Sequence, residues 1–358
     1  MTLQSEKIDE AKLHEFVSKA IGEIGGAMNG LLIFVGDRLG LFKAMAEADN
    51  PMTPDELAQK TGTNPRIIRE WLLSLAAGGY VNYIAEKGRF VLPPEVAIAL
   101  TDVNSPAYIA GGYELLTSVF KDEEKIVQNF KTGKGLGWRD HNNYLFEGTE
   151  RFFKPSYSAY LTKNWIPALQ GVESKLKNGR AKVADVGCGY GVSTILMAKA
   201  YPESEFIGFD YHGPSIEHAR KQAEREGLQN VTFEVAGSTE YHGDDYDLVA
   251  FFDCFHDMGN PAGAAAHAYD ALKKRNGTLI LVEPFAKDKA EENLNPIGRV
   301  FYSASTMICV PASLNENGPA LGAQAGESKL AEVLNAAGFT KIRRAAQTPF
   351  NIILEAKP

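Results

Sequence analysis

The residues with the most distinctive chemistry lie in a glycine-rich run, V-A-D-V-G-C-G-Y-G-V, at positions 183–192. Alternate glycines permit a tight turn and let backbone amides approach a ligand closely. Asp185 stands just before the first glycine of this run, and Asp210 follows about twenty residues after it. A carboxylate at that second position can accept hydrogen bonds from both hydroxyls of an adenosine ribose. The spacing therefore predicts a site for an adenosine-containing cofactor.

Two features separate the classes of adenosine cofactor. The dinucleotide fingerprint G-x-G-x-x-G/A needs a small residue at the position that Val192 occupies here. Asp185 would also repel a pyrophosphate, whereas it would attract the ammonium and sulfonium groups of S-adenosylmethionine. The sequence therefore favours S-adenosylmethionine over a dinucleotide.

The elements that must position this turn are short apolar runs that alternate with helical patterns. Five runs predict strands, at 183–186, 205–209, 231–235, 248–252 and 278–282. Helical patterns near 191–201, 214–226 and 261–274 lie between most of them. Such alternation is typical of a parallel sheet covered by helices on both faces. A helix at 328–337 and two further strands, at 341–344 and 350–354, complete a predicted doubly wound, seven-stranded α/β domain of Rossmann-like type.

Between the fifth predicted strand and the last helix, residues 288–326 show no regular pattern. An irregular segment of this length inside a compact domain is more commonly a lid than a spacer. We therefore expect a lid at about 288–326, within a domain that covers 179–358.

Three motifs resemble those of the class I S-adenosylmethionine-dependent methyltransferases: D-V-G-C-G-Y-G, G-F-D-Y-H and L-V-A-F-F-D-C-F-H-D, at 185–191, 208–212 and 248–257. The likeness covers about 180–285 and 327–358, and the first motif is quite specific. By position, it implies a set of cofactor contacts: Asp185, Gly187, Cys188 and Gly189 at the methionine part, Asp210 at the ribose, Tyr211 beside the adenine, Gly237 and Ser238 at the adenine edge, and Asp253, Cys254 and Phe255 beside the transferred methyl group. Many family members carry an acid where this chain has Ser238, so that contact departs from the family pattern.

His256 follows the predicted strand 248–252, at the end of the sheet where α/β folds place their ligands. Its imidazole can accept a proton near neutral pH, and Asp257 can orient it. Small-molecule O-methyltransferases with an N-terminal winged-helix domain carry a His-Asp pair at a similar place, which implies that His256 is a catalytic base and that oxygen is methylated. The alternative is a histidine that caps the next helix or fills a polar gap.

Aromatic residues suggest the kind of acceptor. Tyr157 and Trp165 precede the glycine run, and Phe301 and Tyr302 lie in the expected lid. They indicate a small, hydrophobic or aromatic acceptor, although aromatic side chains at such spacing more commonly belong to a core. No histidine pair has metal-ligand spacing, so no metal is expected. The three cysteines are far apart, which suits a reducing compartment such as the cytoplasm.

The N-terminal residues 1–104 have the pattern of a winged helix. Thr53 and Asn64 are expected to cap two successive helices, and a hairpin follows at 80–84 and 90–92. Upstream, apolar residues recur at helical spacing on one face: Leu13, Phe16, Val17, Ala20, Ile21 and Ile24. A mostly helical connector is expected at 105–178.

Charge decides between the two uses of a winged helix. Within 53–100, five basic residues are balanced by five acidic ones, and the whole chain carries a formal net charge of -8. DNA binding needs a net basic footprint, so we expect no nucleic-acid partner. In the family that the chain resembles, this domain pairs subunits, which implies a homodimer. A winged-helix regulator that senses S-adenosylmethionine is the alternative function, and a domain that binds this cofactor without methylating is a third.

The longest apolar stretch near the N-terminus, at 30–36, is far too short to cross a bilayer. No membrane partner is therefore expected.

Overall fold

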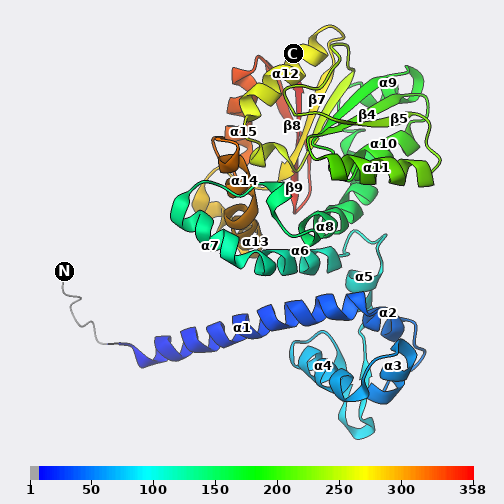
Figure 1. Cartoon of the computed structure of the whole chain (residues 1–358), viewed down its shortest axis with the longest axis vertical. Coiled ribbons are helices and arrows are strands. Elements are labelled where there is room, and N and C mark those ends of the chain that lie inside the picture. The colour runs from blue at the N-terminus through cyan, green and yellow to red at the C-terminus, as the bar shows by residue number, and fades with distance from the viewer. Residues whose placement is uncertain (1–7) are drawn as a thin grey trace. The chain divides into compact units, whose positions relative to one another are not determined.

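The computed structural model describes residues 8–358 and divides the chain into two compact units (Figure 1). Unit 1 runs to Thr117 and includes Glu147–Phe152, whereas unit 2 comprises Ser118–Phe146 and Phe153–Pro358. The expected connector at 105–178 is thus shared between the two units. Among residues 8–358, none of the helices combines the length and the apolar character needed to cross a bilayer.

Unit 1 has the helix, helix and hairpin order of a winged helix, as the sequence predicts. Its elements are α1 (Glu10–Arg38), α2 (Leu41–Ala46), α3 (Pro54–Thr61), α4 (Pro65–Ala77), β1 (Asn82–Ile84), β2 (Arg89–Val91), α5 (Pro94–Thr101) and most of α6 (Ala110–Lys121). Thr53 and Glu56 form a reciprocal capping box at the start of α3, and the Asn64 side chain caps α4. The predicted caps therefore hold, because capping depends on local sequence alone.

Unit 2 is built on a seven-stranded sheet in the order β5-β4-β3-β6-β7-β9-β8. Its strands are β3 (Lys182–Val186), β4 (Glu205–Asp210), β5 (Val231–Val235), β6 (Leu248–Phe252), β7 (Thr278–Pro284), β8 (Lys341–Gln347) and β9 (Asn351–Lys357). The first five are parallel, and β9 runs antiparallel to both of its neighbours. The α/β fold class and all seven predicted strands are confirmed.

Helices cover both faces of this sheet (Figure 1). They are α9 (Val172–Asn178), α10 (Val192–Ala200), α11 (Gly213–Arg225), α12 (Pro261–Lys273) and α15 (Gly326–Ala336). Alternate residues of β6 enter separate cores: Val249 and Phe251 pack with α12, whereas Leu248 and Ala250 pack with α10. This period-two alternation places a hydrophobic layer on each face and leaves the strand ends free to carry polar groups.

Much of the segment at 288–326 is helical, so the prediction that it is irregular is wrong; that it forms a lid stays a prediction. It contains α13 (Pro296–Ala304), a π-helical turn η6 (Ser305–Cys309) and α14 (Val310–Asn315). The Asn295 side chain caps α13, and Pro296 and Pro311 stand at the first turns of α13 and α14. A proline in the first helical turn is tolerated because its missing N–H has no partner there in any case.

Two helices upstream of the sheet complete unit 2. These are α7 (Glu123–Thr132) and α8 (Tyr144–Tyr160), which leads into a second π-helical turn at Leu161–Trp165. Residues 147–152 of α8 belong to unit 1, so α6 and α8 each contribute to both units.

Candidate functional site

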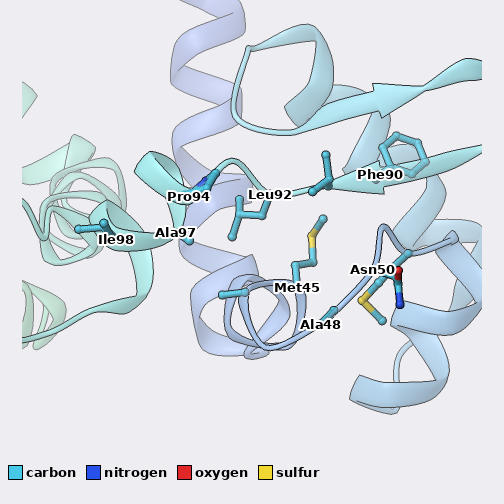
Figure 2. A pocket seen from close by; sticks show the side chains of 11 residues that line it. Met45, Ala48, Asn50, Phe90, Leu92, Pro94, Ala97 and Ile98 are labelled. Carbon is cyan, nitrogen blue, oxygen red and sulfur yellow. The ribbon is translucent and has the colours of Figure 1, made fainter.

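A hollow in unit 1 lacks the side chains for chemistry. It has a volume of about 360 Å³ and is lined by apolar groups such as Met45, Leu92 and Ala97, with Asn50 as its one polar side chain (Figure 2). None of its lining residues ionises. The groups that can move protons or bind charge gather instead in unit 2, where the parallel strands end.

The glycine turn after β3 has the backbone that the sequence predicts. Gly187, Gly189 and Gly191 have φ angles of 75°, 53° and 80°, the left-handed region that favours glycine. A Cβ at Gly187 would lie 2.8 Å from Cys254 Sγ, and one at Gly191 would lie 2.7 Å from the Phe233 ring. Nothing lies within 4 Å of a Cβ at Gly189. Two of the glycines therefore serve packing, and the middle one leaves open backbone that a ligand can approach.

Asp185 is fully buried rather than exposed in the crevice. Its Oδ2 accepts hydrogen bonds from Ser193 Oγ at 2.6 Å and Thr194 Oγ1 at 2.7 Å, both in the first turn of α10. Its Oδ1 is buried and has no hydrogen-bond partner among the described residues. Burial raises the pKa of this carboxyl to about 6. Leaving a buried acceptor unpaired is costly, so Oδ1 is suited to a donor or cation supplied by a ligand.

Asp210 lies at the end of β4, beside the same turn. Its Oδ2 accepts from Gly189 N at 2.9 Å and its Oδ1 from His212 N at 2.8 Å. Burial raises the pKa of the carboxyl. These two backbone donors fix its orientation and leave further lone pairs on both oxygens. The spacing in the sequence that predicted a functional acid at Asp210 therefore agrees with the position of Asp210 over the glycine turn.

The remaining predicted cofactor residues follow the neighbouring strands. Tyr211 is about half exposed, and Gly237 and Ser238 are half-buried in the turn after β5. Cys188 is buried, and Cys254 Sγ lies 3.3 Å from the carbonyl oxygen of Val186. Parallel register brings these strand ends to one edge of the sheet.

Asp253, directly after β6, is half-buried and held in a strained backbone conformation. Its φ of 49° is uncommon for a residue other than glycine. Tyr157 Oη donates to its Oδ2 at 2.6 Å, and Asn351 Nδ2 donates to its Oδ1 at 2.8 Å. Burial, with the charge of Glu283, raises its pKa to about 8. Tyr157, predicted as a substrate contact, thus uses its hydroxyl group to hydrogen-bond Asp253, a predicted cofactor residue.

His256 is paired with Glu283, not with Asp257. The histidine lies in a 3₁₀ turn, η4 (Phe255–Asp257), and its Nδ1 makes a short contact to Glu283 Oε2. The second Glu283 oxygen accepts from Phe255 N at 2.9 Å. Burial opposes protonation of His256, but the charge of Glu283 and the Cys309 side chain outweigh it and raise its pKa well above the ordinary value. The prediction that Asp257 orients His256 is therefore wrong, because the Asp257 side chain bonds to a different residue.

Asp257 receives a hydrogen bond from a tryptophan far away in the sequence. Trp138 Nε1 donates to Asp257 Oδ2 at 2.7 Å. Burial raises the pKa of this carboxyl to about 7. Sequence reasoning placed Glu283 at the mouth of the site but missed its pairing with His256, and it missed Trp138 and Cys309 altogether. An acid within the apolar strand β7 is the one signal that could have indicated Glu283.

Several predicted site residues lie in cores instead. The Phe255 ring is fully buried and packs at 5.3 Å from the Phe251 ring, and Trp165 is buried among apolar residues on the other face of the sheet. Phe301 is buried on α13, and its neighbour Tyr302 is half-buried. Among residues 8–358, no group of three or more His, Cys, Asp or Glu side chains is arranged to hold a metal ion.

Comparison with known proteins identifies both folds. Residues 177–338 match the family model of a methyltransferase domain, and residues 27–102 match that of the Rv2258c-like winged HTH domain. Both matched regions fall where the structure has the corresponding elements. The chain therefore carries a winged helix-turn-helix domain followed by a methyltransferase domain.

Curated relatives match over shorter stretches. A tRNA (guanine-N(7)-)-methyltransferase of Klebsiella pneumoniae is 43% identical over 47 residues, 13% of this chain and 20% of the relative. One from Nitrosococcus oceani is 28% identical over 33% of this chain and 46% of the relative. Demethylsterigmatocystin 6-O-methyltransferase of Aspergillus parasiticus is 28% identical over 40% of this chain and 34% of the relative. The matches thus span less than half the length of these relatives.

Solved structures are similar over nearly the whole chain. The mitomycin 7-O-methyltransferase MmcR has a TM-score of 0.70 at 19% identity, covering 98% of this chain and 100% of that one. A putative O-methyltransferase from Nostoc punctiforme has a TM-score of 0.70 at 18% identity, covering 95% and 98%. Human N-acetylserotonin methyltransferase, solved with SAM, has a TM-score of 0.65 at 13% identity, covering 99% of each chain. At these identities, the likeness establishes the fold.

The raised pKa of Asp253 predicts a pH-dependent stability. The folded protein keeps a proton on Asp253 up to about pH 8, whereas the unfolded chain releases it near pH 4. Wild-type stability therefore falls as pH rises from about 4 to about 8. Asp253→Asn cannot titrate, so its free energy of unfolding relative to wild type should rise by up to ~1 kcal/mol per pH unit over that range and level off above it. Urea unfolding at several pH values measures this difference. An exposed control, Asp49→Asn, should show no such trend, and a flat difference for Asp253→Asn would contradict the assignment.

Proposed function

Because this chain joins a winged helix-turn-helix domain to a methyltransferase domain of the class I, S-adenosylmethionine-dependent fold, we propose that it transfers a methyl group from S-adenosylmethionine to an oxygen of a small, hydrophobic or aromatic acceptor. The buried pair of His256 and Glu283, beside the glycine turn, carries this proposal. It supplies an oriented base where open α/β sheets place their ligands.

The cofactor fits the residues that are present. Asp185 offers an unpaired, buried carboxylate oxygen, and Gly189 leaves the backbone of the turn accessible. Asp210 is fixed in a position to accept from ribose hydroxyls. The carboxyl group of Asp185, whose pKa of about 6 leaves it largely ionised near neutral pH, favours a cationic ligand over a diphosphate. When bound, S-adenosylmethionine supplies a methyl carbon that its sulfonium already activates.

The protein's own contribution is alignment and proton transfer. With Nδ1 held by Glu283, the other ring nitrogen of His256, which has the Cys309 side chain beside it, is the one that can take the proton from the hydroxyl of an acceptor. His256 takes the proton of that hydroxyl as the oxygen is methylated, and Glu283 stabilises the imidazolium that forms. Because the pKa of His256 is raised, its neutral, basic form gains population as the pH rises. Methyl transfer should accordingly be faster on the alkaline side of neutrality.

Asp210→Ala tests the cofactor site. Removing a carboxylate that binds two hydroxyls should weaken the affinity for S-adenosylhomocysteine roughly 100-fold, since hydrogen bonds to charged groups contribute about 1.5–3 kcal/mol each. Isothermal titration calorimetry measures this affinity. An exposed acid on α11 provides the control, because Glu224→Ala removes an equal charge outside the crevice and should bind normally. Equal affinities for Asp210→Ala and wild type would exclude the ribose contact.

His256→Ala tests the base. The variant should bind S-adenosylhomocysteine as wild type does and should slow methyl transfer by roughly 100-fold or more, as general-base catalysis contributes 10²–10⁴-fold. Transfer of a radioactive methyl group across small phenols, carboxylates and thiols measures the rate and shows which atom is methylated. Unchanged turnover in His256→Ala would exclude His256 as the catalytic base. Activity confined to thiols would exclude oxygen as the acceptor atom.

We also infer a homodimer from the N-terminal helix. The apolar face that the sequence predicts lies on α1, a helix of 29 residues, and all of its members except Ala20 are exposed. Phe16 is 66% exposed, Ile21 65%, Ile24 62% and Met28 67%. Val17, Ile21, Ile24 and Met28 are spaced by four, three and four residues, the spacing of a helix seam, which a second copy of the same helix can cover. Large exposed apolar faces of this kind commonly mark protein interfaces.

Ile21→Glu tests the dimer. A charge in the middle of this seam should convert the protein to a monomer, because a buried, unpaired carboxylate is costly. Sedimentation velocity measures the mass of the particle. Gly22→Glu introduces the same side chain on the opposite side of α1, where nothing lies within 4 Å, and should leave the dimer intact. A monomeric wild type would contradict the inference.

The winged helix is not used as a DNA reader in this proposal. Two of the five basic residues within 53–100 are already paired with acids: Arg66 with Glu70 on α4, and Arg89 with Glu56 at 2.8 Å. Such pairs leave little positive charge for phosphates, whose neutralisation supplies most DNA affinity. We therefore infer a small-molecule acceptor and no nucleic-acid partner. The free thiols Cys188, Cys254 and Cys309 support a reducing, cytoplasmic setting.

A further inference from the structure

A glycine-rich segment that follows α7 and includes the first residues of α8, residues 133–146, lies over the site in unit 2; we call it the strap. One end is packed tightly on α14. Leu136 N donates to Pro311 O at 2.9 Å, and a Cβ at Gly135 would lie 2.1 Å from Asn315 N. Gly133 and Gly135 have φ angles of 63° and 84°, so this end has backbone freedom that other residues lack.

The middle of the strap is tied to the start of α7. Asp122 Oδ2 lies 3.1 Å from His141 Nδ1 and accepts from Asn142 N at 2.7 Å. His141 and Asp122 are both buried. The strap is therefore held at its back by α7, which fixes the direction in which its other side chains point.

The inner side of the strap contacts residues that follow three adjacent strands. Trp138 bonds to Asp257, which follows β6. Phe146 stacks on His212, which follows β4, with ring centroids 4.7 Å apart and planes 17° apart. Phe146 also lies 6.2 Å from the ring of Tyr190, in the glycine turn after β3. The strap thus extends over the edge of the sheet where the proposed cofactor binds.

We propose that the strap is the outer wall of the cofactor crevice and that Trp138 is a positioning residue, whose hydrogen bond to Asp257 keeps this wall closed. The identity of the cofactor rests on the proposed function. Asp257 is a half-buried acid, and a hydrogen bond to a carboxylate is stronger than one between neutral partners. Breaking that bond loosens the wall at Trp138, so the cofactor should exchange faster without it.

The test is the rate at which S-adenosylhomocysteine leaves the full-length protein. Trp138→Phe keeps an aromatic ring and removes only the indole N–H. It should release S-adenosylhomocysteine roughly tenfold faster than wild type, the effect of one hydrogen bond to a charged group. Surface plasmon resonance on the immobilised protein measures the dissociation rate. Equal release rates for Trp138→Phe and wild type would overturn the proposal.

A matched control removes the same kind of bond in the other unit. Trp71 Nε1 donates to Leu32 O at 2.9 Å inside the winged helix. Trp71→Phe should release S-adenosylhomocysteine as wild type does. Faster release from Trp71→Phe as well would mean that loss of packing, rather than opening of the strap, causes the effect, and would count against the proposal.

A second measurement needs no variant and separates this inference from the proposed function. Hydrogen–deuterium exchange of residues 133–146 in the wild-type protein should slow several-fold on addition of S-adenosylhomocysteine. Binding of S-adenosylhomocysteine with no change of exchange in the strap would overturn the inference and leave the proposed function standing. Absence of binding to the wild-type protein would overturn both.

Discussion

The contact between His256 and Glu283 is the constraint on which the rest of the site depends. Both side chains are buried, and an ion pair inside a protein is stable only when the remaining polar atoms also have partners. Phe255 N satisfies the second Glu283 oxygen, so the turn that carries the histidine is fixed by the same carboxylate that orients it. Glu283 is in turn held by β7, whose register pairs it with Ile352 of the antiparallel β9.

Around this pair, the site collects more acids than bases. Asp185, Asp253 and Asp257 are each desolvated, and burial raises the pKa of all three carboxyl groups. These carboxyl groups accept hydrogen bonds from hydroxyl, amide and indole groups on α10, α8, β9 and the strap, rather than from cationic side chains. Carboxyl groups whose ionisation is opposed by burial gain most from a ligand that brings positive charge. The same electrostatics disfavours the pyrophosphate that many other glycine turns bind.

The two units use their surfaces differently. The winged helix keeps the capped helices and the hairpin of a DNA-binding fold, yet ion pairs such as Arg89 with Glu56 consume part of its positive charge. Its most conspicuous surface is instead the apolar face of α1. Fold and function are separable here: the same backbone can support a reader of phosphates or a platform for a second subunit, and the surface side chains decide between them.

The sequence by itself determined the strands, the caps of α3 and α4, the glycine turn and the placement of Asp210 and His256. These depend on periodicity and on turn chemistry within a few residues, which local sequence carries in full. Only the tertiary structure decided that Glu283 rather than Asp257 orients His256, that Trp138 bonds Asp257, and that Trp165 belongs to a core. The partners in the first two contacts are 27 and 119 residues apart, so no local pattern relates them. The helices at 296–315 escaped prediction for a related reason: prolines and glycines there suggest a loop, and only burial against the rest of the unit makes the helical arrangement stable.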